Sequence, residues 1–129
     1  MKTINLTQHQ ATPTQVRAGV VELNETWQAD HKAACNFVGI PTPEQVQEAV
    51  DTFRSIMNSY DPDLGDEVQF MIGGAPYFMA ALTQLAPLYK IVFACSNRVS
   101  EEITLPDGTV RKTNTFKHLG FVPMYCPSI

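Results

Sequence analysis

The sequence predicts an α/β protein: a Rossmann-like three-layer core with a mainly parallel sheet, followed by a C-terminal antiparallel β-hairpin. The first observation behind this prediction is a compact β-α-β pattern, in which the apolar strands 67–72 and 90–95 flank a helical pattern over 75–89. Apolar residues dominate both strands, which is typical of a parallel sheet covered on both faces. The second observation is the turn Pro106-Asp107-Gly108 between two strand-like runs, which predicts a hairpin over 98–116.

Length and composition indicate one domain and argue against several classes of protein. Residues 1–129 are expected to form a single domain, because a chain of this length can bury one sizeable core. The net charge of −4 argues against binding to duplex nucleic acid, which needs a concentrated basic surface. The apolar runs are too short to span a bilayer, so no membrane partner is expected. An N-terminus without the apolar stretch of a signal peptide, together with three widely spaced cysteines, predicts a cytoplasmic setting.

The N-terminal half begins with a predicted strand over 4–9, followed by helices over 11–23 and 42–60. Both helices begin with Thr-Pro and carry Gln three residues after the Thr, which is the pattern of a capping box with proline at the first helical position. These residues are Thr12, Pro13 and Gln15 in the first helix, and Thr42, Pro43 and Gln45 in the second. In the second helix, apolar residues at helical spacing predict one buried face.

Three further segments carry weaker patterns. Residues 25–40 include the run AACNFVGI, which fits either a strand or a buried irregular segment. The composition of residues 61–66, DPDLGD, predicts a turn or loop. Residues 118–125 are predicted to add one more short strand, and Pro123 and Pro127 indicate that the chain ends at a sheet edge or in a loop.

In an open α/β sheet, ligands bind outside the carboxyl ends of the strands. Three clusters follow predicted strands, and if those strands are parallel neighbours the clusters share one rim. The clusters are Thr7, Gln8 and His9; Gly73, Gly74 and Ala75; and Ser96, Asn97 and Arg98. This rim is therefore the predicted binding site for a small anionic ligand.

The double glycine Gly73-Gly74 has two interpretations. The helix that begins near Ala75 has no side-chain oxygen at its cap, so its first N–H groups are available to a phosphate or carboxylate, which glycine lets approach closely. Alternatively, glycine is itself an acceptable cap, and tight strand-to-helix turns use it without a ligand. The stretch matches neither a dinucleotide-binding fingerprint nor a P-loop, and no cofactor is predicted.

The charged and titratable rim residues also have two interpretations each. Arg98 can fork onto a phosphate, with hydrogen bonds from Ser96 and Asn97, or it can pair with an acidic neighbour on the hairpin, Glu101 or Glu102. His9 is the candidate catalytic residue, as a general base or as a donor to an anion, and its alternative is a surface capping role. The histidines lack metal-ligand spacing and no CxxC pair occurs, so no metal is predicted.

The motifs INLTQHQATPTQ, IGGAPYFMAAL and FACSNR, in that order, resemble small Rossmann-like proteins associated with CRISPR systems, the CARF-type domains and ring-nuclease-like proteins. The resemblance implies a homodimer that binds cyclic oligoadenylate across the strand ends and, in some members, cleaves it without metal. It implies this role for the residues that match by position at strand ends: Thr7, His9, Gly73, Gly74, Ser96, Asn97 and Arg98. The segment PDGTVRKTNTFKHLGFV resembles the tail of uncharacterised phage and prophage proteins.

Three functional hypotheses follow. The first is binding, with or without metal-independent hydrolysis, of a nucleotide-type phosphorylated ligand, such as a cyclic oligonucleotide. The second is a non-enzymatic, phage-type interaction protein that assembles through its C-terminal hairpin, where edge pairing supplies affinity. The third is an enzyme acting on another phosphorylated small molecule, such as a sugar phosphate. The sequence leaves open whether the protein is an enzyme.

Overall fold

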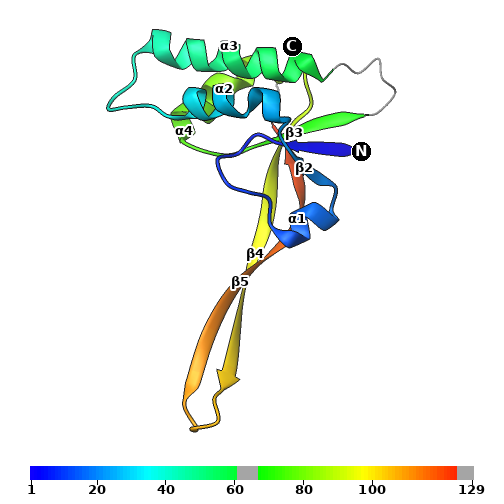
Figure 1. The fold of residues 1–129 in the computed structure, drawn as a ribbon, viewed down its shortest axis with the longest axis vertical. Coiled ribbons are helices and arrows are strands. Elements are labelled where there is room, and N and C mark those ends of the chain that lie inside the picture. Colours follow the sequence, from blue (N-terminus) through cyan, green and yellow to red (C-terminus); the bar gives the residue numbers. More distant parts are fainter. Residues whose placement is uncertain (61–66, 125–129) are drawn as a thin grey trace.

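The computed structural model describes residues 1–60 and 67–124, so the predicted turn at 61–66 and the last five residues lie outside it. The elements, in chain order, are β1 (Lys2–Asn5), α1 (Pro13–Arg17), β2 (Val20–Glu22), α2 (Glu25–Cys35), α3 (Pro43–Ser59), β3 (Val68–Ile72), α4 (Pro76–Leu82), the 3₁₀ turn η2 (Thr83–Leu85), β4 (Ile91–Thr104) and β5 (Val110–Pro123). Helices and strands alternate along most of the chain, and the predicted α/β class is confirmed (Figure 1).

One five-stranded sheet, in the order β2-β1-β3-β4-β5, organises the fold. The first four strands are parallel, with Ile4 opposite Phe70 and Phe70 opposite Ile91, and β5 runs antiparallel to β4. The chain leaves β1 through α1 to reach β2 on one side, and later returns through α2 and α3 to reach β3 on the other side. Connections between parallel strands are right-handed, so two crossovers that run in opposite directions along a sheet place their helices on opposite faces. This applies to α1, which leads from β1 to β2, and to α2 and α3, which lead from β2 to β3.

The main core lies between the sheet and the helices α2, α3 and α4, which gather on one side of it (Figure 1). Alternate residues of β1 and β3, such as Ile4 and Phe70, point into this core and meet Val50 and Phe53 of α3. The opposite face buries a smaller cluster, Val20, Met71 and Val92, covered in part by Ala11, Ala94 and Phe121. The helical layer on one face therefore carries most of the core, and the opposite face carries only this small cluster.

Both predicted capping boxes are present. The Thr12 hydroxyl accepts a hydrogen bond from the Gln15 N–H at 3.3 Å, and the Gln15 side chain accepts one from the Thr12 N–H at 3.0 Å. Thr42 and Gln45 make the same pair of contacts at 3.2 and 2.8 Å. These bonds satisfy N–H groups that the first turn of a helix leaves free, which is why α1 and α3 begin where the sequence predicts.

The predicted helix over 11–23 is wrong in its second half. The helix α1 ends at Arg17, and Gly19, with a φ of 98°, turns the chain into β2. None of the α1 residues is buried, so packing does not extend this helix. Val20, in contrast, is buried beside β1, and its β-branched side chain favours a strand.

Three other boundaries differ from the prediction. The strand β1 spans Lys2–Asn5 rather than 4–9, because the chain after Asn5 bends into a loop. The helix predicted over 75–89 ends at Leu82 and continues as the 3₁₀ turn. Residues 25–35 form the helix α2, so the start of the ambiguous run belongs to a helix, and 36–40 are irregular.

The C-terminal hairpin is confirmed and is longer than predicted. Its strands run over Ile91–Thr104 and Val110–Pro123, so no separate strand begins at residue 118. A register shift between Cys95 and Ser96 leaves Leu119 without an opposite residue, which is a β-bulge. Beyond this bulge the two strands project from the body as a ribbon, and we call residues 96–118 the arm (Figure 1).

Candidate functional site

Strands β1 and β3 form the switch point of the sheet. They are neighbours, but the chain leaves β1 toward β2 and leaves β3 toward β4, in opposite directions. In sheets with this strand order, the diverging loops open a crevice outside the carboxyl ends of the two strands, where ligands bind. Two pockets lie at this place: the β1 pocket, of about 310 Å³, and the glycine pocket, of about 230 Å³. Gln8 lines both.

Asn5 shapes the loop that forms the β1 pocket. Its side chain, at the end of β1, is buried and uses both ends of its amide. The carbonyl oxygen accepts hydrogen bonds from the Thr7 N–H at 2.9 Å and the Thr7 hydroxyl at 2.7 Å. The amide nitrogen donates to the His9 carbonyl oxygen at 2.8 Å and to the Glu22 carboxylate at 3.1 Å. One side chain therefore fixes the backbone on which both Thr7 and His9 are carried.

Glu22 closes the same loop from the neighbouring strand. Its carboxylate, at the end of β2, accepts a second hydrogen bond from the Ala11 N–H at 2.8 Å. Two neutral donors therefore hold the negative charge at the border of the β1 pocket. Thr7, His9 and Gln8 are left on the rim, where their side chains are partly or fully exposed.

His31 supports the floor of the β1 pocket from α2. Its ring is buried, and Nε2 lies 2.7 Å from the Leu6 carbonyl oxygen. A carbonyl oxygen only accepts, so Nε2 carries the hydrogen and donates it. The ring also packs against Phe53 of α3, with centroids 5.3 Å apart. The histidine thus ties Leu6, the first residue after β1, to the helical layer.

The glycine pocket adjoins the β1 pocket and has an aromatic wall. Gln8 donates from its side-chain nitrogen to the Cys35 carbonyl oxygen at 2.8 Å, which joins the loop after β1 to the end of α2. Burial raises the pKa of the Cys35 thiol, more than the hydrogen bond from Gln8 lowers it, so this thiol stays protonated at neutral pH. Phe37 and Tyr77 meet edge to face at 5.6 Å, and Tyr77 is half exposed.

The two glycines of this pocket differ in what the backbone requires. Gly74 has a φ of 156°, a region that residues with a side chain rarely adopt. Gly73 has no such constraint, and a methyl group added to it would meet Thr7 Cγ2 at an ordinary 3.6 Å. The following helix, α4, has Ala75 as its N-cap residue and therefore no side-chain cap. The turn therefore explains Gly74, while neither the backbone conformation nor a close contact requires glycine at position 73.

We expect alanine substitution to separate these two glycines. Gly74→Ala should lower the free energy of unfolding by about 1–2 kcal/mol, because alanine would be strained at this backbone conformation. Gly73→Ala should change it by less than about 0.5 kcal/mol. Urea unfolding of both variants beside the wild-type protein measures the difference. Equal losses would show that Gly73 is also needed by the fold.

The structure brings four of the predicted site residues to the switch point. Thr7 and His9 line the β1 pocket, Gly73 and Gly74 line the glycine pocket, and Gln8 connects the two pairs. Ser96, Asn97 and Arg98 instead lie on the exposed part of β4 in the arm, and they line neither pocket. Their role in binding stays a prediction, and it requires a ligand that extends beyond the two pockets.

The alternative role for Arg98, an ion pair within the hairpin, is not present. Among residues 1–60 and 67–124, the single ion pair joins Arg54 to Asp51 at 3.8 Å. Arg98 lies opposite Phe116 in the register of the hairpin, and Glu102 lies opposite Lys112. The Arg98 guanidinium is therefore exposed on the arm without a carboxylate partner among the described residues.

Sequence reasoning missed Asn5, Glu22, His31 and Tyr77 as parts of this site. Asn5 had a usable signal, because Asn followed two residues later by Thr is a typical side-chain turn at the end of a strand. Glu22 was hidden by the error that placed it in a helix. His31 and Tyr77 were not recognisable without α2 and the aromatic contacts, because a lone histidine or tyrosine on a helix carries no spacing signal.

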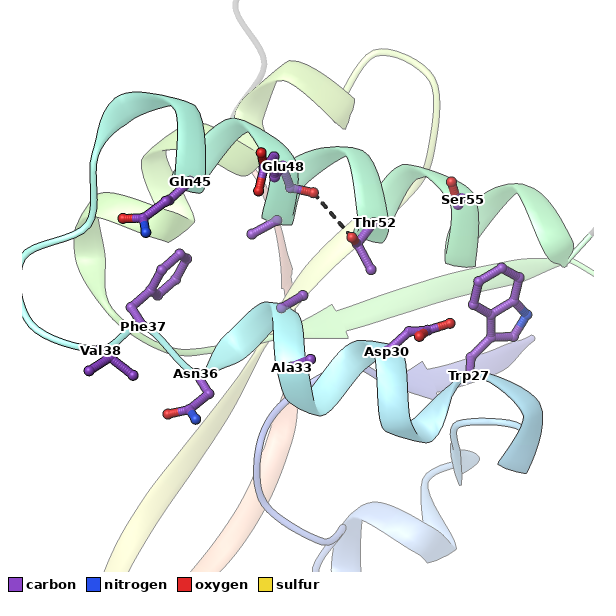
Figure 2. A pocket seen from close by; sticks show the side chains of 12 residues that line it. Trp27, Asp30, Ala33, Asn36, Phe37, Val38, Gln45, Glu48, Thr52 and Ser55 are labelled. Carbon is purple, nitrogen blue, oxygen red and sulfur yellow. Dashed lines mark hydrogen bonds between the residues drawn. The ribbon is translucent and has the colours of Figure 1, made fainter.

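A larger hollow, of about 560 Å³, lies between α2 and α3 (Figure 2). Figure 2 shows the two helices side by side, with Trp27 near one end of the hollow and Phe37 near the other. Asp30 from α2 and Glu48 from α3 both line it. These two carboxylates disfavour an anionic ligand. The glycine pocket has no charged side chain in its lining, so this part of the switch point is the better candidate for one.

Three further observations bear on the class of protein. No three His, Cys, Asp or Glu side chains gather as a metal site in the part of the chain that the structure describes. None of the helices described is both long and apolar enough to cross a membrane. No curated protein and no solved structure matches the chain. A family model does match residues 1–122, and the chain belongs to the family that this model describes, the Uncharacterized protein MJ1673 family.

Proposed function

We propose that this protein binds a nucleotide-type phosphorylated ligand at the carboxyl ends of β1 and β3. The observation that carries the proposal is the pair of pockets at the switch point, which share Gln8 as a common wall. This is where sheets of this topology hold their ligands. The lining combines polar groups on the β1 loop with aromatic rings beside the glycines, as small-molecule sites commonly do.

Different groups that line the two pockets suit the base and the phosphate of such a ligand. The aromatic edge formed by Phe37 and Tyr77 offers a surface on which a base can stack. Gly73 lines the glycine pocket without a side chain, which lets a phosphate approach its backbone closely. The Gln8 side-chain amide has one N–H beyond the one it donates to Cys35, and this neutral donor suits the single negative charge of a phosphodiester.

A cyclic or linear oligonucleotide would extend past the two pockets toward the arm, where Ser96, Asn97 and Arg98 are the predicted further contacts. Cleavage without metal would use His9 as the base. It would accept the proton of a ribose 2′-hydroxyl, whose oxygen attacks the adjacent phosphorus to form a 2′,3′-cyclic phosphate and expels the 5′-oxygen. The leaving oxygen takes a proton from water, and protonated His9 gives its proton to the hydroxide that remains. Positioning and stabilisation of the charged phosphorane are the main requirements for such a step.

The test is thermal unfolding against mononucleotides, linear and cyclic oligonucleotides, and sugar phosphates. A ligand that binds only the folded protein, present at a hundred times its dissociation constant, adds about 2.7 kcal/mol of stability and raises Tm. We expect a selective shift from one class of nucleotide. Gln8→Ala and Tyr77→Ala should reduce this shift, because they remove a shared wall and a stacking surface.

Gln47→Ala is the matched control, since Gln47 is an exposed glutamine on α3 that lines neither pocket. Its ligand-induced shift should equal that of the wild-type protein. A shift from sugar phosphates alone would contradict the nucleotide assignment. A selective shift that survives in both Gln8→Ala and Tyr77→Ala would place the ligand elsewhere.

A second candidate function is assembly with another protein through the arm, and the projecting ribbon favours it. A phage-type interaction protein of this kind would show no selective response in the ligand panel. Its binding surface would be the exposed strand edges of residues 96–118. In either case the free thiols Cys35 and Cys95 fit the reducing, cytoplasmic setting that the sequence predicts.

A further inference from the structure

Along the arm, the outer edge of β4 has no neighbouring strand in the part of the chain that the structure describes. The strand β3 accompanies β4 only as far as Phe93, which lies opposite Ile72. From Ser96 to Thr104, β4 has β5 on one side and no strand on the other among the described residues. Nearly all side chains of this segment are exposed. A two-stranded ribbon is marginally stable in water, and an open edge of this length is a template for another strand.

We propose that a second copy of this chain pairs with this edge, β4 against β4, in an antiparallel arrangement centred on Ser100. The two arms would then form one four-stranded ribbon, in the order β5-β4-β4-β5, with each backbone supplying hydrogen bonds to the other. Charge complementarity within β4 selects both the partner and the register. This inference concerns assembly and does not depend on the proposed ligand.

Symmetry limits the possible registers. Two copies related by a two-fold axis perpendicular to the ribbon keep the same face of the sheet on the same side, so the axis must pass midway between a residue and its own copy. With the axis at Ser100, Arg98 lies opposite the partner's Glu102, and the same pair occurs twice. With the axis at Glu101, two like charges lie opposite each other, and with the axis at Val99, Arg98 loses its carboxylate partner.

The other edge of the arm is a poorer surface for a second copy. Residues 110–123 carry Arg111, Lys112 and Lys117 and contain no aspartate or glutamate. Pairing β5 with β5 would bring basic side chains together across the new interface, which is destabilising. The β4 pairing instead continues a row that already exists, because Lys112 lies opposite Glu102 within each hairpin. The row becomes Lys112, Glu102 and the partner's Arg98, with alternating sign.

Exchange of the two charges tests the register. We expect the wild-type protein to elute at twice its 14.3 kDa mass in size-exclusion chromatography with light scattering. Arg98→Glu and Glu102→Arg should each raise the dimer dissociation constant by about tenfold or more, because each places like charges opposite each other twice. An equimolar mixture of the two variants should form a heterodimer, since each opposite pair then has complementary charges again.

Lys117→Glu is the control, because it makes the same change of charge on β5, where Lys117 lies opposite Asn97. It should leave the dimer intact. A wild-type chain that stays monomeric at high concentration overturns the proposal. So does a mixture that fails to form the heterodimer, or a dimer that only Lys117→Glu dissociates. Circular dichroism confirms that each variant is folded.

Two further measurements test the register of the dimer and separate assembly from ligand binding. Ser100→Cys places a thiol beside the two-fold axis, opposite its own copy, and mild oxidation should cross-link the two, beyond the background of the wild-type protein. Asn114→Cys, opposite Ser100 on β5, should not cross-link, and the reverse result contradicts the register.

Arg98 is also a predicted ligand contact, so the ligand panel is repeated on Arg98→Glu and on Glu102→Arg. A role in assembly changes both variants alike, whereas a ligand contact changes Arg98→Glu alone.

Discussion

Phe53→Ala should lower the free energy of unfolding by about 3–5 kcal/mol, the largest loss expected from any single substitution considered for this protein. Phe53 is 1 % exposed and lies in the middle of α3, where that helix packs on the sheet. Its ring meets Phe78 at 5.1 Å and His31 at 5.3 Å between centroids. Alanine would therefore remove contacts between three helices at one point and leave a cavity among them.

The same substitution should also weaken the candidate site. Phe53 lines the glycine pocket, and the two rings it supports belong to α2 and α4, which carry the walls of both pockets. We expect any ligand-induced rise in Tm to be reduced in Phe53→Ala, even under conditions where the protein is still folded. This links the hydrophobic core directly to the binding site.

Urea unfolding followed by circular dichroism measures the loss. Phe53→Leu should cost less, about 1–1.5 kcal/mol, because leucine fills most of the same volume. Val38→Ala is the exposed control, since Val38 is 86 % exposed, and it should change stability by less than about 0.5 kcal/mol. A cost below about 1 kcal/mol for Phe53→Ala would contradict the packing of α3 described above.

The parts of the fold that the sequence predicted are those in which local signals and packing agree. The helix over 42–60 has a capping box and a continuous apolar face, and α3 has nearly the same bounds. The hairpin was predicted because Pro106-Asp107-Gly108 is a strong turn, and the structure adds that Asp107 accepts hydrogen bonds from both the Thr109 N–H and hydroxyl. These signals act over a few residues and need no distant partner.

The errors arise where a distant neighbour decides the structure. Val20 becomes part of a strand because β1 offers an edge beside it, and no local pattern in 11–23 shows that edge. Arg98 was placed on the rim because the strand was assumed to end at Cys95, whereas pairing with β5 carries β4 on to Thr104. The positions of Thr7 and Gly73 were easier to predict, because parallel strands bring their carboxyl ends to the same edge.

The amide of Asn5 is the part of the site that a substitution can test most directly. Asn5→Ala should lower the free energy of unfolding by about 2–4 kcal/mol, because it removes four hydrogen bonds, each worth about 1 kcal/mol. It also leaves the Thr7 N–H and the His9 carbonyl oxygen without their partner at the edge of the core. The loop that carries Thr7, Gln8 and His9 should lose its fixed conformation, and selective ligand binding should be lost with it.

Asn5→Asp separates the two ends of this amide. The acceptor for Thr7 is kept, but the donor to His9 and Glu22 is lost, and a second carboxylate is placed about as close to Glu22 as the present 3.1 Å contact. We expect a loss at least as large as that of Asn5→Ala at pH 7, and a smaller one at pH 4, where protonation of the carboxyl restores a donor.

Asn114→Ala is the matched control, because Asn114 is exposed and accepts a single hydrogen bond, from Ser100. If Asn5→Ala destabilises the protein no more than Asn114→Ala does, the Asn5 amide does not hold the loop. In that case the β1 pocket must be fixed by Glu22 and His31 instead, and ligand binding should depend on those two side chains.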